Sequence, residues 1–226
     1  MVSLLANIGI IFLAFYFYLR SKLGILAYQE NRKISYFIKC VFAEVLLGMI
    51  LLSFSIVIMD IRFDFRFLLF CFSAKYLDWK ITNSSIVLLA ILRFFWGSID
   101  IAQTNLLASI MIAVTLPLLV HYTKDKMSDL SQLLILVTIS IIPTILITNH
   151  VIADKSLVLT IGLMLFACGY AATFIMYHFI TDLYSLIASA NTDDLTTLKN
   201  GRTFNAKLLE IERNMQSVTV AMIDVD

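Results

Sequence analysis

The run LVLTIGLMLFACGYAATFIMYHFI, residues 157–180, contains no Asp, Glu, Lys or Arg. About 20 mostly apolar residues are enough for a helix to cross the hydrocarbon core of a bilayer, which is about 30 Å thick. The run therefore predicts a membrane-spanning helix. Further apolar runs of similar length predict four more spans, at 2–19, 35–59, 101–120 and 131–151.

The composition of the whole chain agrees with this prediction. Of the 226 residues, 60% are hydrophobic and only 15% are charged, whereas about a quarter of the residues of a soluble domain are charged. One water-soluble core cannot bury this excess, so we expect an all-α, multi-pass bundle in the cell membrane. The formal net charge of +1 gives no reason to expect nucleic acid as a partner.

Two shorter apolar segments, 66–77 and 84–98, lie in the middle of the chain. They are either two tilted membrane helices or a re-entrant pair buried in the bundle. The bundle therefore has seven crossings if both segments cross, and five if they do not.

Basic residues predict the orientation of the bundle. They gather in alternate connections between the apolar segments: Arg20, Lys22, Arg32 and Lys33, then Lys75 and Lys80, then Lys124 and Lys126. Because basic loops remain in the cytoplasm, we expect an N-terminus outside and everything after Ile180 inside. Both crossing counts give a cytoplasmic C-terminus.

The polar C-terminal part changes character in steps. Residues 181–190 keep helical spacing with no Pro or Gly, which predicts that the last membrane helix continues beyond the bilayer. A turn-like stretch follows, and then an amphipathic helix at about 202–215. The β-branched run SVTVAMID, 217–224, predicts a buried strand. We divide the chain into a membrane domain, 1–180, a helical linker, 181–192, and a cytoplasmic α/β segment, 193–226.

Four ionisable residues lie at or near the depth of the membrane. Glu44 and Arg93 fall inside apolar segments, and Asp64 and Arg66 just before one. Such groups cost a few kcal/mol at membrane depth, so they normally face the bundle interior and find partners. They bind a small polar ligand at the outer side, or they pair with one another and hold the helices together; the residues alone leave both alternatives open.

The stretch TDDLTTLKNGRTF, residues 192–204, resembles the opening motif of GGDEF domains, TDxLTGLxNRRxF. Thr197 stands in place of the usual Gly and Gly201 in place of the first Arg. The helix and strand that follow agree with the order of that family. The matching residues are Thr192, Asp193, Leu195, Thr196, Leu198, Asn200, Arg202 and Phe204.

A second resemblance covers RFDFRFLLFCFSAKYLDW, residues 62–79, together with Arg93. It is similar to the membrane receptor module of the LytS-YhcK type, in which an outer Asp-x-Arg precedes a short helix and an Arg lies on the next one. Asp64, Arg66 and Arg93 are the counterparts. The double glycine usual after that last Arg is not present; only Gly97 remains.

Together the resemblances imply the sensor part of a diguanylate cyclase, which joins two GTP molecules into cyclic di-GMP as a homodimer with Mg²⁺. In that family Asp224 corresponds to the metal ligand of the first strand, with the backbone carbonyl of Val225 as a second contact. Metal ions in such sites neutralise phosphate charge and orient the attack.

The chain contains no Gly-Gly pair, so the signature hairpin of the GGDEF family is missing. We therefore expect a truncated domain without catalytic residues and without cyclase activity. One alternative is a receptor with a degenerate output that acts by protein contact. Another is a small transporter whose path is lined by Glu44 and Arg93.

Overall fold

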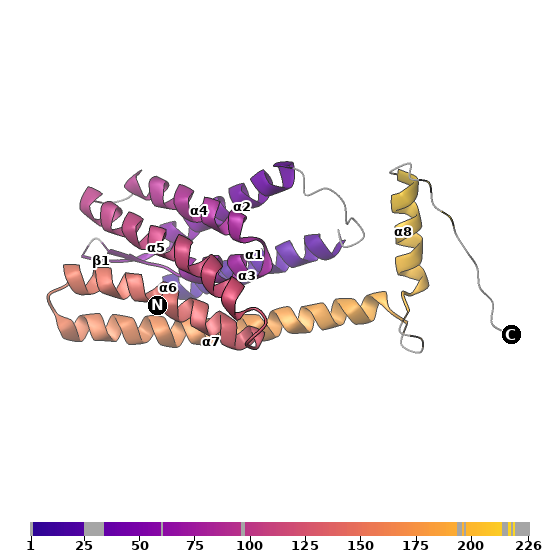
Figure 1. Ribbon diagram of the computed structural model, residues 1–226. Helices are drawn as coiled ribbons and strands as arrows, with labels where there is room; N and C mark the ends of the chain where they lie inside the picture. The colour runs from indigo at the N-terminus through magenta and orange to yellow at the C-terminus, as the bar shows by residue number, and fades with distance from the viewer. Residues whose placement is uncertain are drawn as a thin grey trace. The chain divides into compact units, whose positions relative to one another are not determined.

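The computed structural model describes residues 2–24, 34–59, 61–95, 98–193, 196, 198–213, 217 and 219 (Figure 1). Its fold is mostly helical. Residues 1–15 and 32–177 form one compact unit, and residues 16–31 and 178–226 form a second. The elements are α1 (Val2–Gly24), α2 (Ile34–Ser53), β1 (Ile56–Ile58), β2 (Ile61–Phe63), α3 (Arg66–Tyr76), α4 (Trp79–Leu92), η1 (Arg93–Phe95), α5 (Ile99–Thr123), α6 (Asp129–Val151), α7 (Lys155–Asn191) and α8 (Gly201–Arg213).

Within the described residues, 4 helices are long and apolar enough to cross a membrane: α2 from Tyr36, α5, α6 and α7. The apolar part of α1 is shorter, Ser3–Leu19. Large apolar side chains on these helices are exposed. On α5 alone, half or more of the surface is open at Leu107, Ile110, Met111, Val114 and Leu118. Exposing such an apolar surface to water is unfavourable, whereas lipid chains accommodate it. The predicted all-α membrane bundle is confirmed to this extent.

The helix α3 lies in the interior of the bundle. Residues Phe67 to Ala74 are all buried, and the helix packs against α2, α4, α5 and α6. With 11 residues in α3 and 14 in α4, the two helices are only about 16 and 21 Å long at 1.5 Å per residue. Both are shorter than the hydrocarbon core.

Polar side chains near Lys75 link α3 to α5 and α6. Nζ of Lys75, at the end of α3, donates to Asp129 Oδ1 at 2.7 Å and also to Oε1 of Gln132 on α6. Gln132 in turn donates to Oγ1 of Thr123 on α5 at 2.7 Å. The end of α3 is therefore tied to α6 directly and to α5 through Gln132.

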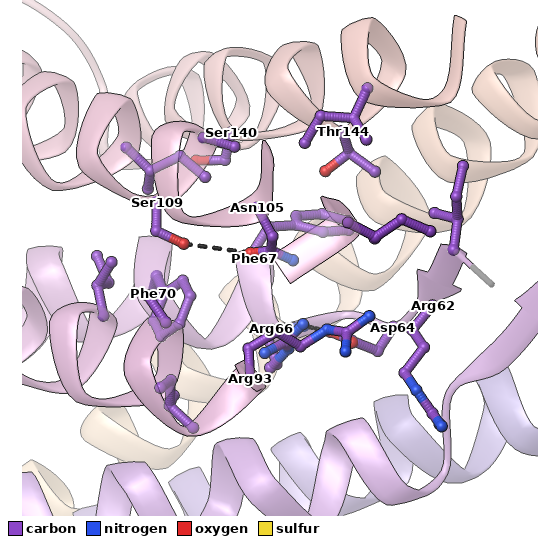
Figure 2. Close-up of a pocket in the computed structure, with 18 residues that line it drawn as sticks. Arg62, Asp64, Arg66, Phe67, Phe70, Arg93, Asn105, Ser109, Ser140 and Thr144 are labelled. Carbon is purple, nitrogen blue, oxygen red and sulfur yellow. Dashed lines mark hydrogen bonds and ion pairs between the residues drawn. The ribbon is translucent and has the colours of Figure 1, made fainter. Parts of the chain in front are cut away.

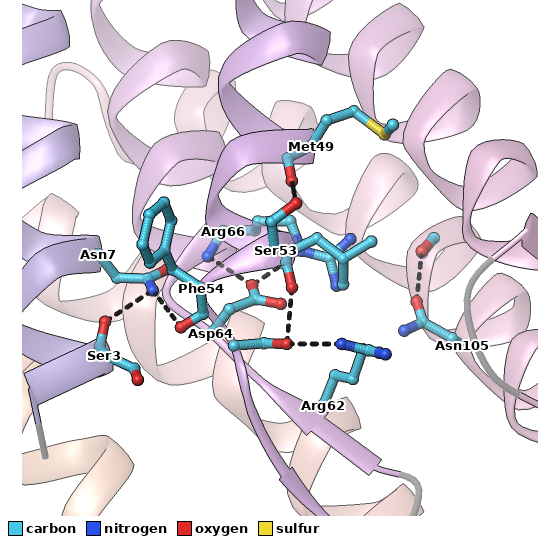
Figure 3. A network of polar contacts seen from close by, with 12 residues as sticks. Ser3, Asn7, Met49, Ser53, Phe54, Arg62, Asp64, Arg66 and Asn105 are labelled. Carbon is cyan, nitrogen blue, oxygen red and sulfur yellow. Dashed lines mark hydrogen bonds and ion pairs between the residues drawn. The ribbon is translucent and has the colours of Figure 1, made fainter.

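A β-hairpin replaces the end of a predicted helix. We expected one helix over 35–59, but α2 ends at Ser53, and the strands pair Ile56 with Phe63 and Val57 with Arg62. The sequence Ile-Val-Ile has the branched side chains that favour strands, and Met59 takes the left-handed φ of 48° at the turn. Asn7 of α1 donates to the Phe54 carbonyl at 3.0 Å and so ties α1 to the start of the hairpin (Figure 3).

The continuous helix expected beyond Ile180 is observed, because α7 runs to Asn191. In the second unit, the residues of the GGDEF-like motif build a joint between α7 and α8. Asp193 Oδ1 accepts from the backbone N–H of Thr196 at 3.0 Å, and Asn200 Nδ2 donates to the Ala190 carbonyl at 2.9 Å. The predicted amphipathic helix is α8. The predicted strand over 217–224 falls outside the described residues, apart from 217 and 219.

The side chain of Asn200 caps α8, because its Oδ1 accepts from the backbone N–H of Thr203 at 3.0 Å. Replacing an N-cap Asn by Ala costs about 0.5–2 kcal/mol of helix stability. We therefore expect Asn200→Ala to speed amide hydrogen exchange in the first turn of α8 several-fold, as measured by mass spectrometry. Asn205→Ala, at an exposed position inside the same helix, is the matched control. Equal exchange in the two variants would contradict the cap.

Candidate functional site

Arg93 is the most deeply buried charged side chain among the described residues, with 1% of its surface exposed. It begins the short turn η1 that follows α4. Its Nε and Nη1 are buried, and neither has a hydrogen-bond partner in the described part of the protein. Native proteins nearly always satisfy buried polar groups, so these two nitrogens call for a partner such as an ordered water or a bound anion.

Asp64 and Arg66 are placed by the start of α3. Asp64 Oδ1 accepts from the backbone N–H of Arg66 at 3.0 Å and from its Nε at 2.8 Å. One carboxylate oxygen therefore accepts from the first backbone N–H of α3 and also neutralises the guanidinium. The other, Oδ2, is buried and has no partner among the described residues. The sequence left two alternatives open: these residues bind a ligand, or they pair with one another. Asp64 and Arg66 do pair with each other, whereas Arg93 is not part of this pair.

A cavity of about 80 Å³ adjoins these side chains (Figure 2). A single water needs about 10–15 Å³ in this measure, so there is room for several waters or for one small solute. The charged wall comprises Arg62, Asp64, Arg66 and Arg93. The facing wall carries neutral polar groups from α5 and α6, namely Asn105, Ser109, Ser140 and Thr144.

The charge of the cavity is positive. Three guanidinium groups face one carboxylate, and Asp64 already pairs with Arg66 at 2.8 Å. Among the described residues, the hydrogen-bond partner of the Arg62 side chain is neutral: Nη1 donates to Ser55 Oγ at 3.3 Å. Guanidinium groups with free N–H donors in a partly dehydrated cavity are suited to carboxylate or phosphate oxygens. The arrangement can therefore bind a small anion.

Glu44, which we also predicted as a ligand-binding residue, is not among the residues that line this cavity. It lies at 5% exposure on α2, where its Oε2 accepts from Ser73 Oγ at 2.9 Å. Ser73 also shares a hydrogen bond of 2.8 Å with Thr82 Oγ1. The carboxyl group thus belongs to a separate buried polar cluster that joins α2, α3 and α4.

Glu44→Gln is expected to leave anion affinity within about twofold of the wild type and to leave the protein at least as stable. The amide keeps an acceptor for Ser73 and removes a buried carboxylate whose desolvation is costly. Titration calorimetry and thermal unfolding in detergent check the two parts, with Ser73→Ala as the control for the hydrogen bond. A tenfold loss of anion affinity would show that Glu44 belongs to the ligand site after all.

The other predicted site residues are placed as follows. Asp193, Thr196 and Asn200 form the joint between α7 and α8, and Arg202 is exposed on α8. Leu195, Asp224 and Val225 lie outside the described residues, so the predicted metal ligands remain a prediction. Among the residues that the structure describes, no three His, Cys, Asp or Glu side chains gather as a metal site.

Sequence reasoning did not single out Arg62, nor the polar wall on α5 and α6. One signal was present: Ser140 and Thr144 are four residues apart in an apolar helix, so they share one face. Small polar residues on a shared face of a membrane helix also mark helix contacts, so the spacing alone does not identify a ligand wall.

No protein-family model, curated protein or solved structure matches this chain. Its function is therefore argued from the site itself.

Proposed function

We propose that the membrane bundle is a receptor for a small anionic solute. One observation carries this proposal: Arg93 is buried beside a cavity with two guanidinium nitrogens that have no partner in the described structure. A buried charge without a partner destabilises a protein by several kcal/mol. An anion that binds there relieves this cost and gains charge-assisted hydrogen bonds.

The position of the cavity along α5 and α6 supports access from outside the cell. The cavity is lined by Asn105, near the start of α5, and by Thr144 and Ile147, near the end of α6. The connection at the other ends of these helices carries Lys124 and Lys126. Basic loops favour the cytoplasm, so the proposed site lies toward the outer face.

We further propose that the receptor belongs to a diguanylate cyclase signalling protein. This part rests on the resemblance of residues 192–204 to the opening of GGDEF domains and of residues 62–79 to LytS-YhcK receptors. In such a protein two GTP molecules and Mg²⁺ meet in a homodimer, with Asp224 and the Val225 carbonyl as metal ligands. The helix α7 continues from its apolar run to the motif and provides the connection.

Two measurements test these proposals separately. Calorimetric titration of the purified protein with small carboxylates and phosphate is expected to show saturable binding, and no binding of any anion would contradict the receptor. Residues 1–190 fused to a complete GGDEF domain are expected to make cyclic di-GMP from GTP at a rate that changes with the bound anion. A rate that the anion leaves unchanged would contradict the signalling role.

A further inference from the structure

Within the described residues, two of the three arginines at the cavity have no carboxylate partner. Arg66 is neutralised by Asp64, whereas Arg62 contacts a serine hydroxyl. Arg93 has two nitrogens with no partner in the part of the chain that the structure describes. The cavity wall therefore carries two uncompensated positive charges in addition to one neutral ion pair.

We infer that the ligand is a small dianion, with one negative charge facing Arg93 and the other facing Arg62. The inference rests on the proposed receptor function and narrows its ligand class. A monoanion would neutralise only one of the two guanidinium groups of Arg62 and Arg93, whereas a dianion neutralises both.

The hairpin holds Arg62 in place for this role. Arg62 lies on β2 between two buried residues, Ile61 and Phe63, and Ile61 also lines the cavity. Arg62 pairs across the hairpin with Val57 and lines the cavity. Its Nη1 donates to Ser55 Oγ, and Figure 3 shows Arg62 near the Asp64–Arg66 pair. A hydrogen bond of 3.3 Å to a neutral hydroxyl is weak, so an anion can replace it.

The facing wall disfavours a ligand with a positive group. Asn105, Ser109, Ser140 and Thr144 are uncharged, and the one carboxylate at the cavity, Asp64, is already bound to Arg66. An ammonium group would therefore find one carboxylate oxygen without a described partner, Asp64 Oδ2, against three guanidinium groups. Neutral hydroxyl and amide groups instead suit the remaining oxygens of an anion.

The cavity limits the size of the dianion. With about 80 Å³, it holds about five to eight waters at 10–15 Å³ each. A dicarboxylate of about four carbons and inorganic phosphate share the required charge and fit this space, whereas a nucleotide does not. The two sources are separated by the choice of probe.

Calorimetric titration of the full chain in detergent provides the test. Succinate is compared with succinamate, which has nearly the same shape and one negative charge; inorganic phosphate is the third probe. We expect one dianion, succinate or phosphate, to bind at least tenfold more tightly than succinamate. In Arg62→Gln this preference should fall to about twofold while succinamate binding persists, which also shows that the variant is folded. Arg202→Gln, on the exposed face of α8, is the matched control and should keep the preference.

The outcomes separate the two levels of the proposal. Equal binding of succinate and succinamate, with phosphate no tighter, would overturn the dianion and leave an anion receptor. A preference that survives in Arg62→Gln would overturn the role of Arg62. Binding of none of the three probes would overturn both the dianion and the receptor.

Discussion

Arg93→Gln is expected to abolish anion binding and, at the same time, to leave the unliganded protein as stable as the wild type or more stable. The guanidinium has two nitrogens without partners in the described structure, and hydrogen bonds to charged groups contribute about 1.5–3 kcal/mol each. Loss of two such bonds lowers affinity by a factor of about 100 or more. Gln fills part of the same space and carries no charge, so its burial avoids the cost of removing a charge from water.

Calorimetry and thermal unfolding, measured with and without anion, check this pair of effects. The unfolding temperature of the wild type should rise when the anion is added. The variant should unfold at a temperature at least as high as that of the unliganded wild type, and the anion should not change it. Arg93→Lys keeps the charge but not the planar fork, so we expect weaker binding that is not abolished. A variant that unfolds earlier and still binds the anion would show that Arg93 holds the bundle together and is not the ligand-binding group.

Gly48→Leu is expected to cause the largest loss of stability that a single added side chain produces in this bundle. A Cβ placed at Gly48 on α2 would lie 2.9 Å from Leu89 Cδ2 on α4, and nearer still to Cδ1. The helices α2 and α4 pack directly against each other, so the new side chain has to displace the buried Leu89 side chain or separate the two helices. Overpacking of this kind costs about 1–3 kcal/mol, and more where the backbone cannot shift.

The matched experiment uses Leu89→Ala, which leaves a cavity where Gly48→Leu adds a side chain. Each single variant should unfold at lower temperature or denaturant concentration than the wild type, and the double variant should recover most of the loss. Gly9→Leu, at a position on α1 where nothing lies within 4 Å of an added Cβ, is the control and should change stability little. Additive losses in the double variant would show that α2 and α4 do not meet at these residues.

The sequence predicts most of the helices because a long apolar run has only one stable form in a bilayer. It does not predict the hairpin, since Ile56, Val57 and Ile58 are apolar and look like the end of a span. It identifies Asp64, Arg66 and Arg93, because charges are conspicuous among apolar residues. It does not show that Glu44 lies apart from these three residues. The orientation of α2 about its own axis decides which polar cluster a side chain on that helix joins. Arg62 and the polar wall of α5 and α6 depend on tertiary packing, which no local pattern contains.

The short helix α3 is fastened at both of its ends. Its first residue, Arg66, is bound to Asp64 at the cavity, and Lys75, near its last residue, is bound to Asp129 and Gln132. Lys75 lies nine residues after Arg66, so α3 extends about 14 Å, at 1.5 Å per residue, from the cavity to the polar contacts with α6. Because a helix this short does not bend easily, we expect a displacement of Arg66 at the cavity to reach Lys75 and its contacts with α6.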